Sequence, residues 1–309
     1  MYSYLKTVPT EIESESRIIV VPDVHSDLKK AKECLRLAGV LNRKDEWVGG
    51  NTIVVQIGDQ VDGGERGPVV KRKEHVCNLA TKRDVSVIRF FNKLHNKAIE
   101  DGGAVYCIVG NHEMMNVYGD FRYAGIDDCE KCARVRGLAF QKGGAVARIL
   151  ATTRNIYIKI GRIVFVHAGF LPWHLKAMGM QPHRINNTFT NMLLGNPVSQ
   201  IDQAVFDRVT MDMQGILTNR SYTPDRHISV VEVDEVLDYL DADHMIIGHN
   251  AHQQGITPLH GGRVWVVDPG MSYSVMNSEA AILEITPREN LSLQVSHPQR
   301  RHSFRVMNA

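Results

Sequence analysis

Five apolar runs in this chain each end in an Asp, an Asn or a His, and this recurrence restricts the fold more than any other feature. The first run, "RIIVV", leads into Asp23 and His25, after which apolar residues recur at helical spacing. A buried strand, a short loop and a helix are therefore expected. The other four runs end in polar residues in the same way: at Asp59 with Asp62 beyond it, at Asn111-His112-Glu113, at His167 and at His249.

Helical patterns lie between the first three runs, notably "VSVIRFFNKLHNKAIEDGG", which ends at Gly102 and Gly103. Strands that alternate with helices indicate parallel pairing and a layered α/β architecture. Loops at the carboxyl ends of strands are where open α/β sheets place their chemistry. We therefore expect the polar ends of the five runs to line one crevice.

A single Asp or His at a strand end is most often a hydrogen-bonded structural residue or a helix cap. Two carboxylates and four imidazole or amide groups in one crevice are harder to explain, because burying them is costly without a compensating cation. These ligand types suit Mn²⁺, Fe²⁺ or Fe³⁺, and Zn²⁺. The set exceeds what one ion needs and fits two ions that share a carboxylate.

The composition suits a globular protein, since 43% of the 309 residues are apolar, enough for one large domain or two small ones. The net charge is only +2, and no extended basic block occurs, so neither a nucleic acid nor a membrane is expected as a partner. No segment reaches the roughly 20 apolar residues that span a bilayer. The first residues, "MYSYLKTVPTEIESES", lack the features of a secretory signal, and a cytoplasmic location is expected.

The five cysteines are odd in number and lie mostly in apolar surroundings, which favours reduced thiols. Cys129 and Cys132 form "CEKC" in a charged stretch, and a redox or metal-binding pair is one interpretation. No second pair is present to complete a zinc site. Two free thiols in an insertion are therefore the preferred interpretation.

Taken together, the motifs resemble those of the calcineurin-like metallophosphoesterases, whose pattern is D-x-H, G-D-x-x-D, G-N-H-E, a later H, and G-H-x-H. The blocks occur here in that order over residues 17–270. "FVHAGFLP" is similar to a block of the phosphoprotein phosphatases within that superfamily. More narrowly, "GNHEMMNVYGDFRYAG" and "VVDPGMS" resemble the Shewanella-like phosphatases, a bacterial-type branch.

The resemblance implies a layered sandwich of two mixed β-sheets flanked by helices, with a dinuclear metal site at the carboxyl ends of the strands. It implies a phosphatase that hydrolyses phosphomonoesters by direct attack of a metal-bridging hydroxide. The ions would be two divalent metals, Mn²⁺ in the first place, with Fe or Zn as alternatives. The expected organisation is an N-terminal tail (1–16), a catalytic domain (17–290) with an insertion (63–84) and a cap (about 172–228, with a helix over 201–213), and a C-terminal segment (291–309).

The family's roles carry over residue by residue. Asp23, His25 and the bridging Asp59 would bind the first metal, and Asp59, Asn111, His167 and His249 the second. His112 would be the general acid that protonates the leaving oxygen, and Asp62 would orient it. These roles suit phosphoryl transfer, which needs its charge neutralised and a proton for the leaving group.

The chain departs from the family pattern at two places. In the last block, His252 stands one residue later than the second His of G-H-x-H, and it is expected to lie behind the ligands or at the surface. The other departure concerns a phosphate-binding arginine. Phosphoprotein phosphatases read G-D-x-V-D-R-G, and that Arg grips the phosphate, but Gly63 stands in its place here. Arg66 is one candidate replacement, because two glycines would let the loop fold back, and a surface role beside Glu65 is the other interpretation. Arg220 in "GILTNRSYTP" matches an Arg that contacts phosphate in this branch, and its planar fork suits phosphate oxygens.

The expected substrate is a phosphoprotein or a small phosphomonoester, and the sequence does not decide between phosphoserine, phosphothreonine and phosphotyrosine. A second hypothesis is a dinucleoside polyphosphate hydrolase or phosphodiesterase on the same scaffold. A third is a non-catalytic binding scaffold, which the intact set of six ligand positions and the His112 and Asp62 pair disfavour.

Overall fold

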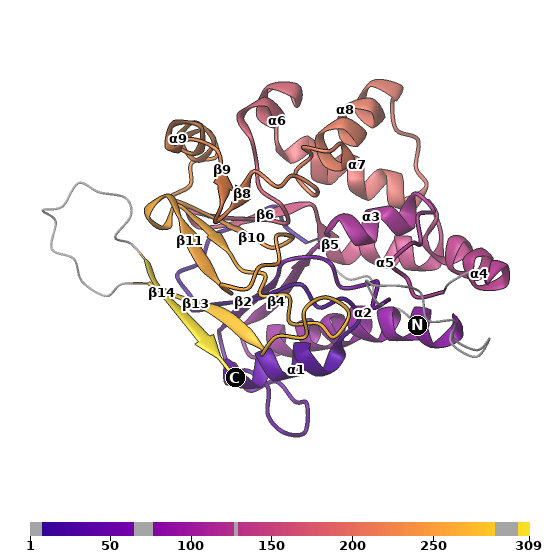
Figure 1. The fold of residues 1–309 in the computed structure, drawn as a ribbon, viewed down its shortest axis with the longest axis horizontal. Coiled ribbons are helices and arrows are strands. Elements are labelled where there is room, and N and C mark those ends of the chain that lie inside the picture. The colour runs from indigo at the N-terminus through magenta and orange to yellow at the C-terminus, as the bar shows by residue number, and fades with distance from the viewer. Residues whose placement is uncertain (1–7, 65–76, 127–128, 288–301) are drawn as a thin grey trace, which may run out of the picture.

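The computed structural model of the chain describes residues 8–64, 77–126, 129–287 and 302–309. Within these residues, two six-stranded sheets pack face to face, and helices cover the outer face of each sheet (Figure 1). Each sheet contains both parallel and antiparallel strand pairs. The predicted architecture of two mixed sheets flanked by helices is confirmed.

The first sheet carries the first three predicted strands, side by side and parallel. Its order is β14-β13-β2-β3-β4-β5, with β2 to β5 parallel and β13 and β14 antiparallel to their neighbours. The strands are β2 (Ile18–Val21), β3 (Ile53–Gln56), β4 (Ala104–Ile108), β5 (Arg154–Asn155), β13 (Ala281–Pro287) and β14 (His302–Asn308).

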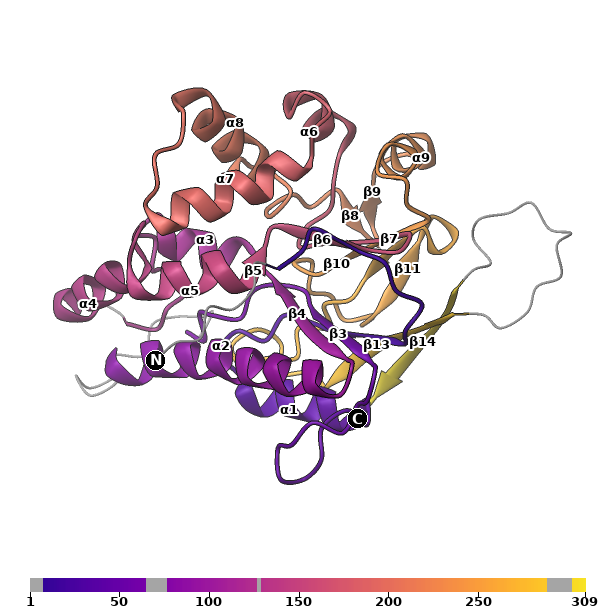
Figure 2. The same ribbon diagram turned by 180° about the vertical axis from the view of Figure 1, so that it is seen from behind.

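Two helices, α1 (Leu28–Leu37) and α2 (Cys77–Glu100), cover the outer face of this sheet, and Figure 2 shows α2 running beneath β3 and β4. Asp27 starts α1 by accepting a hydrogen bond from the backbone N–H of Lys30 at 3.0 Å. Alternate residues of β2, Ile19 and Val21, face these helices because successive side chains of a strand point to opposite faces.

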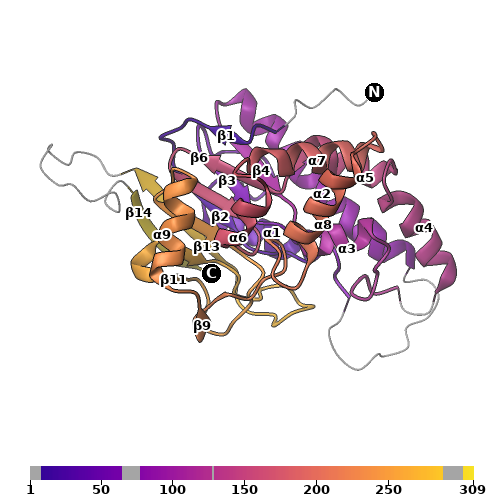
Figure 3. The same ribbon diagram turned by 90° about the horizontal axis from the view of Figure 1, so that it is seen from above.

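The second sheet carries the last two predicted strands. Its order is β1-β6-β7-β10-β12-β11, and β7, β10 and β12 are parallel. The strands are β1 (Glu11–Ile12), β6 (Tyr157–Ile160), β7 (Ile163–Val166), β10 (His244–Ile247), β11 (Thr257–Leu259) and β12 (Val264–Val266). The outer helices are α5 (Ala145–Thr153), α6 (Pro172–Ala177), α7 (His183–Leu194), α8 (Gln200–Met211) and α9 (Val230–Tyr239), and α6, α8 and α9 are nearest the viewer in Figure 3.

Apolar side chains fill the layer between the two sheets. Val20 and Val55 from the first sheet pack with Phe165 and Ile246 from the second, and all four are fully buried. β-branched and aromatic residues suit such a doubly covered surface. The strand ends of both sheets are thereby held in a fixed relation to one another.

The predicted boundaries differ from the structure at three places. Residues Glu11 and Ile12 of the expected tail pair with β6, and β14 of the C-terminal segment forms the edge of the first sheet. Most of the predicted insertion, residues 65–76, lies outside the described residues, but residues 77–84 form the start of α2 and Asp84 is buried. The predicted helix over 201–213 is confirmed as α8, within the expected cap, which also holds α6, α7 and the hairpin β8 (Tyr222–Thr223) and β9 (Arg226–His227).

The prediction of free thiols at Cys129 and Cys132 is wrong, because these residues form a disulfide. Cys129 is the N-cap of α4 (Glu130–Phe140) and Cys132 lies in its first turn, so the helix start holds their Cα atoms 5.3 Å apart, within the range that a disulfide needs. Cys34 and Cys107 are free and buried. Of the helices that the structure describes, none combines the length and apolar character that crossing a membrane requires.

Candidate metal centre and acid–base pair

Eight predicted site residues lie within six residues of the carboxyl ends of five strands, which belong to both sheets. The first sheet supplies the residues after β2, β3 and β4, the last of them at the start of α3 (Asn111–Val117), and the second sheet supplies those after β7 and β10. The structure brings all eight together: Asp23, His25, Asp59, Asp62, Asn111, His112, His167 and His249.

The backbone of this site is strained. His25, Asp59, Asp62 and His249 have positive φ angles of 38°, 49°, 67° and 63°. Residues other than glycine adopt this region at a cost of about 1–3 kcal/mol, and such conformations cluster at functional sites. The strain therefore supports a functional role for these loops.

Asp59 lies at the centre of the cluster. Its Oδ2 atom is 3.3 Å from His167 Nε2, 3.7 Å from His25 Nε2 and 3.9 Å from His112 Nε2. Its Oδ1 accepts the backbone N–H of His112 at 3.0 Å. Two groups of ligand atoms, each within 4.8 Å, share this carboxylate: His25, Asp59 and His112, and Asp59, His167 and His249.

Backbone carbonyls orient the three predicted histidine ligands. His25 Nδ1 lies 3.2 Å from the carbonyl of Val61, and His167 Nδ1 lies 2.8 Å from that of Ile57. His249 Nε2 lies 3.1 Å from the carbonyl of Thr218. Because a carbonyl only accepts, each of these nitrogens carries the proton, and the other nitrogen of a neutral ring presents a lone pair to the site.

The atoms that face the site are therefore acceptors. His249 Nδ1 and His167 Nε2 lie 3.0 Å and 3.1 Å from Asn111 Oδ1. Asp23 Oδ2 accepts the backbone N–H of His249 at 3.0 Å, whereas its buried Oδ1 has no hydrogen-bond partner. Acceptor atoms that carry lone pairs thus face one another, and this arrangement requires a cation between them.

The charged groups of the site also favour a bound cation. Burial, together with Asp268 and Asp59, raises the pKa of Asp23 well above its usual value. Burial alone would lower the pKa of His167, but the carboxylates of Asp59 and Asp23 raise it to about 10. The two carboxylates thus favour a positive charge at this position, and a metal ion would supply that charge.

The residues present fit the two divalent ions that the sequence predicts. Carboxylate, imidazole and amide oxygen donors converge from five loops, and Asp59 belongs to both groups of ligand atoms. Gly248 leaves room for Asp23, since a Cβ atom there would lie 2.3 Å from Asp23 Oδ1. Asp23 itself is in neither compact group and lies beside them through its contact with His249.

His112 and Asp62 form a buried pair next to this cluster. His112 Nδ1 lies 2.8 Å from Asp62 Oδ2, and the exposed fractions of the two residues are 4% and 0%. Nε2 of His112 is thereby turned toward the side of the site on which Asp59 lies. The ring also packs edge-on against His25, with 4.7 Å between the ring centroids.

Glu113 belongs to a predicted motif, but its role was not foreseen. Its buried carboxylate accepts backbone N–H groups of Asp59, Gln60, Val61 and Gly110 at 2.7 to 3.2 Å. It thereby ties the loop after β3 to the start of α3. The position of the central Asp59 therefore depends on a residue that is not itself a ligand.

Sequence reasoning also missed a polar network behind Asp62, formed by Asn116, Arg136 and Asp84. Arg136 is fully buried on α4, where Cys132 and Phe140 flank it at a spacing of four residues. A charged residue on the apolar stripe of a helix is the signal that could have pointed to it.

The two arginines predicted to bind phosphate have different outcomes. Arg66 lies outside the described residues. Arg220 is exposed, donates from Nη1 to Asn250 Oδ1 at 3.2 Å, and its charge is among the causes, after burial and His167, that lower the pKa of His249. Its guanidinium therefore lies near the second group of ligand atoms.

The position of the missing arginine is crowded. The hydroxyl of Tyr273 donates to the carbonyl of Gly63 at 2.9 Å and accepts from Arg83 Nη1 at 3.2 Å. A Cβ atom on residue 63 would lie 2.6 Å from that hydroxyl. Because Gly63 has no side chain, it leaves room for the hydroxyl of Tyr273.

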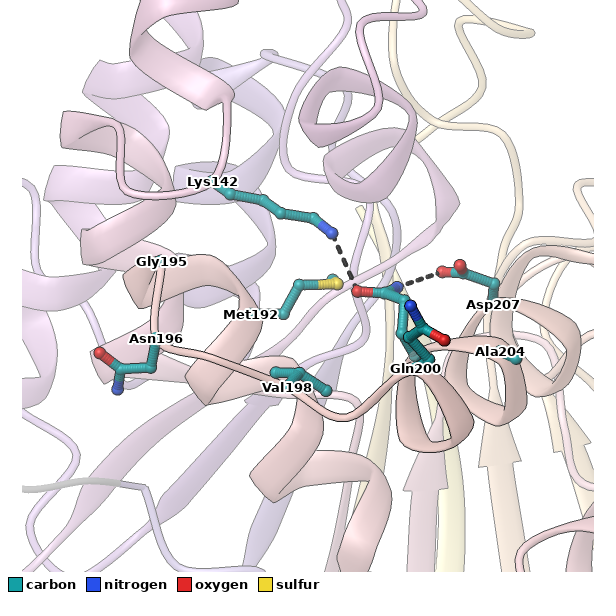
Figure 4. Close-up of a pocket in the computed structure, with 9 residues that line it drawn as sticks. Lys142, Met192, Gly195, Asn196, Val198, Gln200, Ala204 and Asp207 are labelled. Atoms are coloured by element: carbon teal, nitrogen blue, oxygen red, sulfur yellow. Dashed lines mark hydrogen bonds between the residues drawn. The ribbon is translucent and has the colours of Figure 1, made fainter.

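A separate cavity of about 600 Å³ lies among α7, α8 and the segment before α5 (Figure 4). Lys142 Nζ donates to Gln203 Oε1 at 2.9 Å, and Gln203 Nε2 donates to Asp207 Oδ1 at 2.7 Å across its wall. None of the predicted ligands lines it. The candidate metal centre is distinct from this cavity.

Comparison with known proteins agrees with the motifs. The family model described as calcineurin-like phosphoesterase matches residues 16–253. Shewanella-like protein phosphatase 2 of Arabidopsis thaliana is 25% identical over 94% of this chain and 80% of its own length. Shewanella-like protein phosphatase 1 of Plasmodium berghei is 26% identical over 84% of this chain and 68% of its own length.

The fold also matches solved structures. The crystal structure of a cold-active protein-tyrosine phosphatase from a psychrophilic Shewanella superposes with a TM-score of 0.71 over 92% of this chain and 79% of that one. The sequence identity is 19%, so this likeness concerns the fold alone. The resemblance inferred from the motifs is confirmed by the family model and the curated relatives.

Proposed function

Because this chain belongs to the calcineurin-like phosphoesterase family, we propose that it is a metal-dependent phosphatase that hydrolyses phosphomonoesters, with phosphoproteins as its main substrates. The observation that carries the proposal is the buried Asp59 carboxylate shared by two groups of ligand atoms, with the His112 and Asp62 pair beside it. This arrangement combines the two requirements of phosphomonoester hydrolysis, neutralisation of phosphate charge and protonation of the leaving oxygen.

We propose that Asp23, His25 and Asp59 hold one ion and that Asp59, Asn111, His167 and His249 hold the other. Two bound divalent ions would neutralise the phosphoryl oxygens and lower the pKa of the attacking water. Mn²⁺ is the proposed metal, with Fe or Zn as alternatives, since all three accept carboxylate and imidazole ligands. The carbonyl contacts of Val61, Ile57 and Thr218 keep the histidine lone pairs directed at the ions.

His112 is the proposed general acid. Asp62 accepts from Nδ1 and stabilises the protonated ring, so Nε2 carries the proton that passes to the leaving oxygen. Arg220 is the proposed phosphate-binding residue, because its guanidinium is exposed near His249. Arg66 is a second proposed phosphate contact.

The substrate class is argued from the relatives. Two curated relatives are named as Shewanella-like protein phosphatases, and one of the solved structures that superpose is named as a protein-tyrosine phosphatase. We propose a phosphorylated protein side chain as the substrate, and the choice between phosphotyrosine and phosphoserine or phosphothreonine is left to assay.

The deciding experiment is hydrolysis of p-nitrophenyl phosphate by metal-stripped protein before and after addition of Mn²⁺. Turnover is expected only with the metal. Asp59→Asn and His112→Asn should both lose activity, the latter by about 10²–10⁴-fold, the usual contribution of a general acid or base. Two exposed positions, Asp238→Asn and His183→Asn, provide matched controls that should retain it.

Three outcomes would count against the proposal. Mn²⁺-independent turnover would remove the metal centre from the mechanism. Metal binding without turnover would leave a binding scaffold. Preferential hydrolysis of bis(p-nitrophenyl) phosphate over the monoester would favour the phosphodiesterase alternative.

A further inference from the structure

A buried ionic network stands behind the acid–base pair, and its hub is Arg136. The exposed fractions of Arg136, Asp62, Asp84 and Asn116 are 0%, 0%, 1% and 1%. Four separate segments meet here, because Asp62 follows β3, Asp84 lies on α2, Asn116 on α3 and Arg136 on α4. Neither the family motifs nor the proposed reaction assigns any function to Arg136.

The guanidinium of Arg136 contacts the three other members of the network at once, and its Nη1 also donates to Thr81 Oγ1 at 3.5 Å. Nη2 donates to Asp62 Oδ1 at 2.7 Å, Nε donates to Asn116 Oδ1 at 2.5 Å, and Nη1 lies 2.5 Å from Asp84 Oδ2. The planar fork of arginine can meet three such acceptors, whereas the single ammonium of lysine cannot match this geometry. The group also lies over the ring of Phe140, with 4.8 Å between Cζ and the ring centroid.

The two carboxylate oxygens of Asp62 have different partners. Oδ1 accepts from Arg136, and Oδ2 lies against His112 Nδ1 at 2.8 Å. Asn116 Nδ2 donates to both oxygens, at 2.9 Å and 3.0 Å, and to the carbonyl of His112 at 2.8 Å. The carboxylate therefore cannot rotate without breaking the bond to Arg136.

Asp84 holds the network from the other side. Its Oδ1 accepts the backbone N–H of Asp62 at 3.2 Å and the hydroxyl of Ser26. Burial and the neighbouring Asp62 raise the pKa of Asp84 to about 6 against the opposing charge of Arg136. Arg136 therefore bridges two buried carboxylates, and one of them, Asp62, contacts His112.

We propose that Arg136 is a positioning residue of the reaction: it fixes the Asp62 carboxylate and, through Asp62, the orientation of His112. The inference rests on the proposed function, since it assigns His112 the role of general acid. An arginine that only stabilised the fold would affect all substrates alike. An arginine that acts through His112 affects substrates in proportion to their need for a proton on the leaving oxygen.

The test compares phenyl phosphate, whose leaving group needs a proton, with 2,4-dinitrophenyl phosphate, whose leaving group does not. For Arg136→Met, kcat on phenyl phosphate should fall by about 100-fold, the lower range of a general acid contribution, and kcat on the dinitrophenyl ester by less than about threefold. Arg136→Lys should restore part of the loss. Arg134→Met, an exposed change two residues away on the same helix, should leave both rates unchanged.

A second measurement is independent of turnover. In ¹⁵N-labelled protein, the proton between His112 Nδ1 and Asp62 should give a strongly downfield imidazole resonance that His112→Asn removes. Arg136→Met should abolish or shift that resonance, and Arg134→Met should not. If the wild-type protein hydrolyses neither ester, the proposed function fails while this measurement still decides the role of Arg136.

Removal of a buried cation alone could unfold the protein. The double variant Arg136→Met/Asp84→Asn removes one cation and one anion, so the net buried charge is unchanged. It should fold and show the same dependence on the leaving group. Equal losses on both esters, or an unchanged His112 resonance in folded variants, would overturn the proposal and leave Arg136 a structural residue.

Discussion

The variant Gly63→Arg, which places the arginine of the family motif at position 63, should lower both the stability and the activity of this protein. A Cβ atom at that position would lie 2.6 Å from the hydroxyl of Tyr273, 2.8 Å from Ser26 Cβ and 3.0 Å from the carbonyl oxygen of His25. The first atom of any side chain therefore meets three neighbours. Two of them belong to the loop that carries the proposed ligand His25, so Gly63→Arg should displace that loop.

The magnitude follows from the contacts that must change. Overpacking a filled site costs about 1–3 kcal/mol, and loss of the hydrogen bond from Tyr273 to the Gly63 carbonyl costs about 1 kcal/mol more. The sum is about 2–4 kcal/mol. An unfolding entropy of about 2.1 cal/mol/K per residue, or roughly 0.65 kcal/mol/K for 309 residues, converts this into a fall in Tm of about 3–6 °C.

Thermal unfolding and p-nitrophenyl phosphate hydrolysis would measure the two effects. We expect kcat/KM to fall by about tenfold or more, since misplacing a reacting group by about 1 Å costs about 100-fold. Gly63→Ala should show most of the loss, because its Cβ already makes the contacts. Gly137→Ala, in the interior of α4 with a nearest neighbour at 3.7 Å, should instead stabilise by up to about 1 kcal/mol. An unchanged Tm together with a higher kcat/KM in Gly63→Arg would refute the reasoning.

Three further predictions concern the metals, pH and the disulfide. Chelation should lower the Tm of Mn²⁺-loaded protein and added Mn²⁺ should restore it; an unchanged Tm would argue against bound ions that link the strand ends. Burial lowers the pKa of His174 to about 4, so the unfolded chain binds a proton below about pH 6.5 that the folded protein does not bind until about pH 4. The free energy of unfolding should therefore fall by up to about 3 kcal/mol from pH 6.5 to 4. Urea unfolding at several pH values would measure this slope, and His174→Gln should flatten it. Replacing Cys129 and Cys132 by Ala should cost roughly 2 kcal/mol in the absence of a reductant and nothing with dithiothreitol present; equal stability of the two proteins without reductant would contradict this.

The strands and the positions of the predicted ligands could be inferred from the sequence because both depend on local patterns. Each strand is a short apolar run, and each predicted ligand follows its run within a few residues. The contacts of Arg136 were not predictable in this way, since its hydrogen bond to Asp62 spans 74 residues. No local period records which buried helix position will meet a carboxylate so far away along the chain.

Two of the predictions that differ from the structure have a common cause. Composition indicated free thiols at Cys129 and Cys132 and a surface insertion that reached Asp84. Composition does not reveal that the start of a helix brings the two cysteines together. It also does not reveal that Asp84 lies on a turn of α2 that faces the interior. Polar residues there are buried because specific partners satisfy them.

The proposed ligands are divided between two sheets, and this division has a consequence for how the enzyme can be tuned. Asp23, His25 and Asp59 follow strands of one sheet, whereas His167 and His249 follow strands of the other. The distance between the ligands of the two sheets therefore depends on how closely the sheets pack, through side chains such as Phe165 and Ile246, and bound ions would be spaced accordingly. Substitutions in that apolar layer should change the distance between the ligands of the two sheets. They should thereby alter the catalytic rate although every ligand and every loop keeps its sequence.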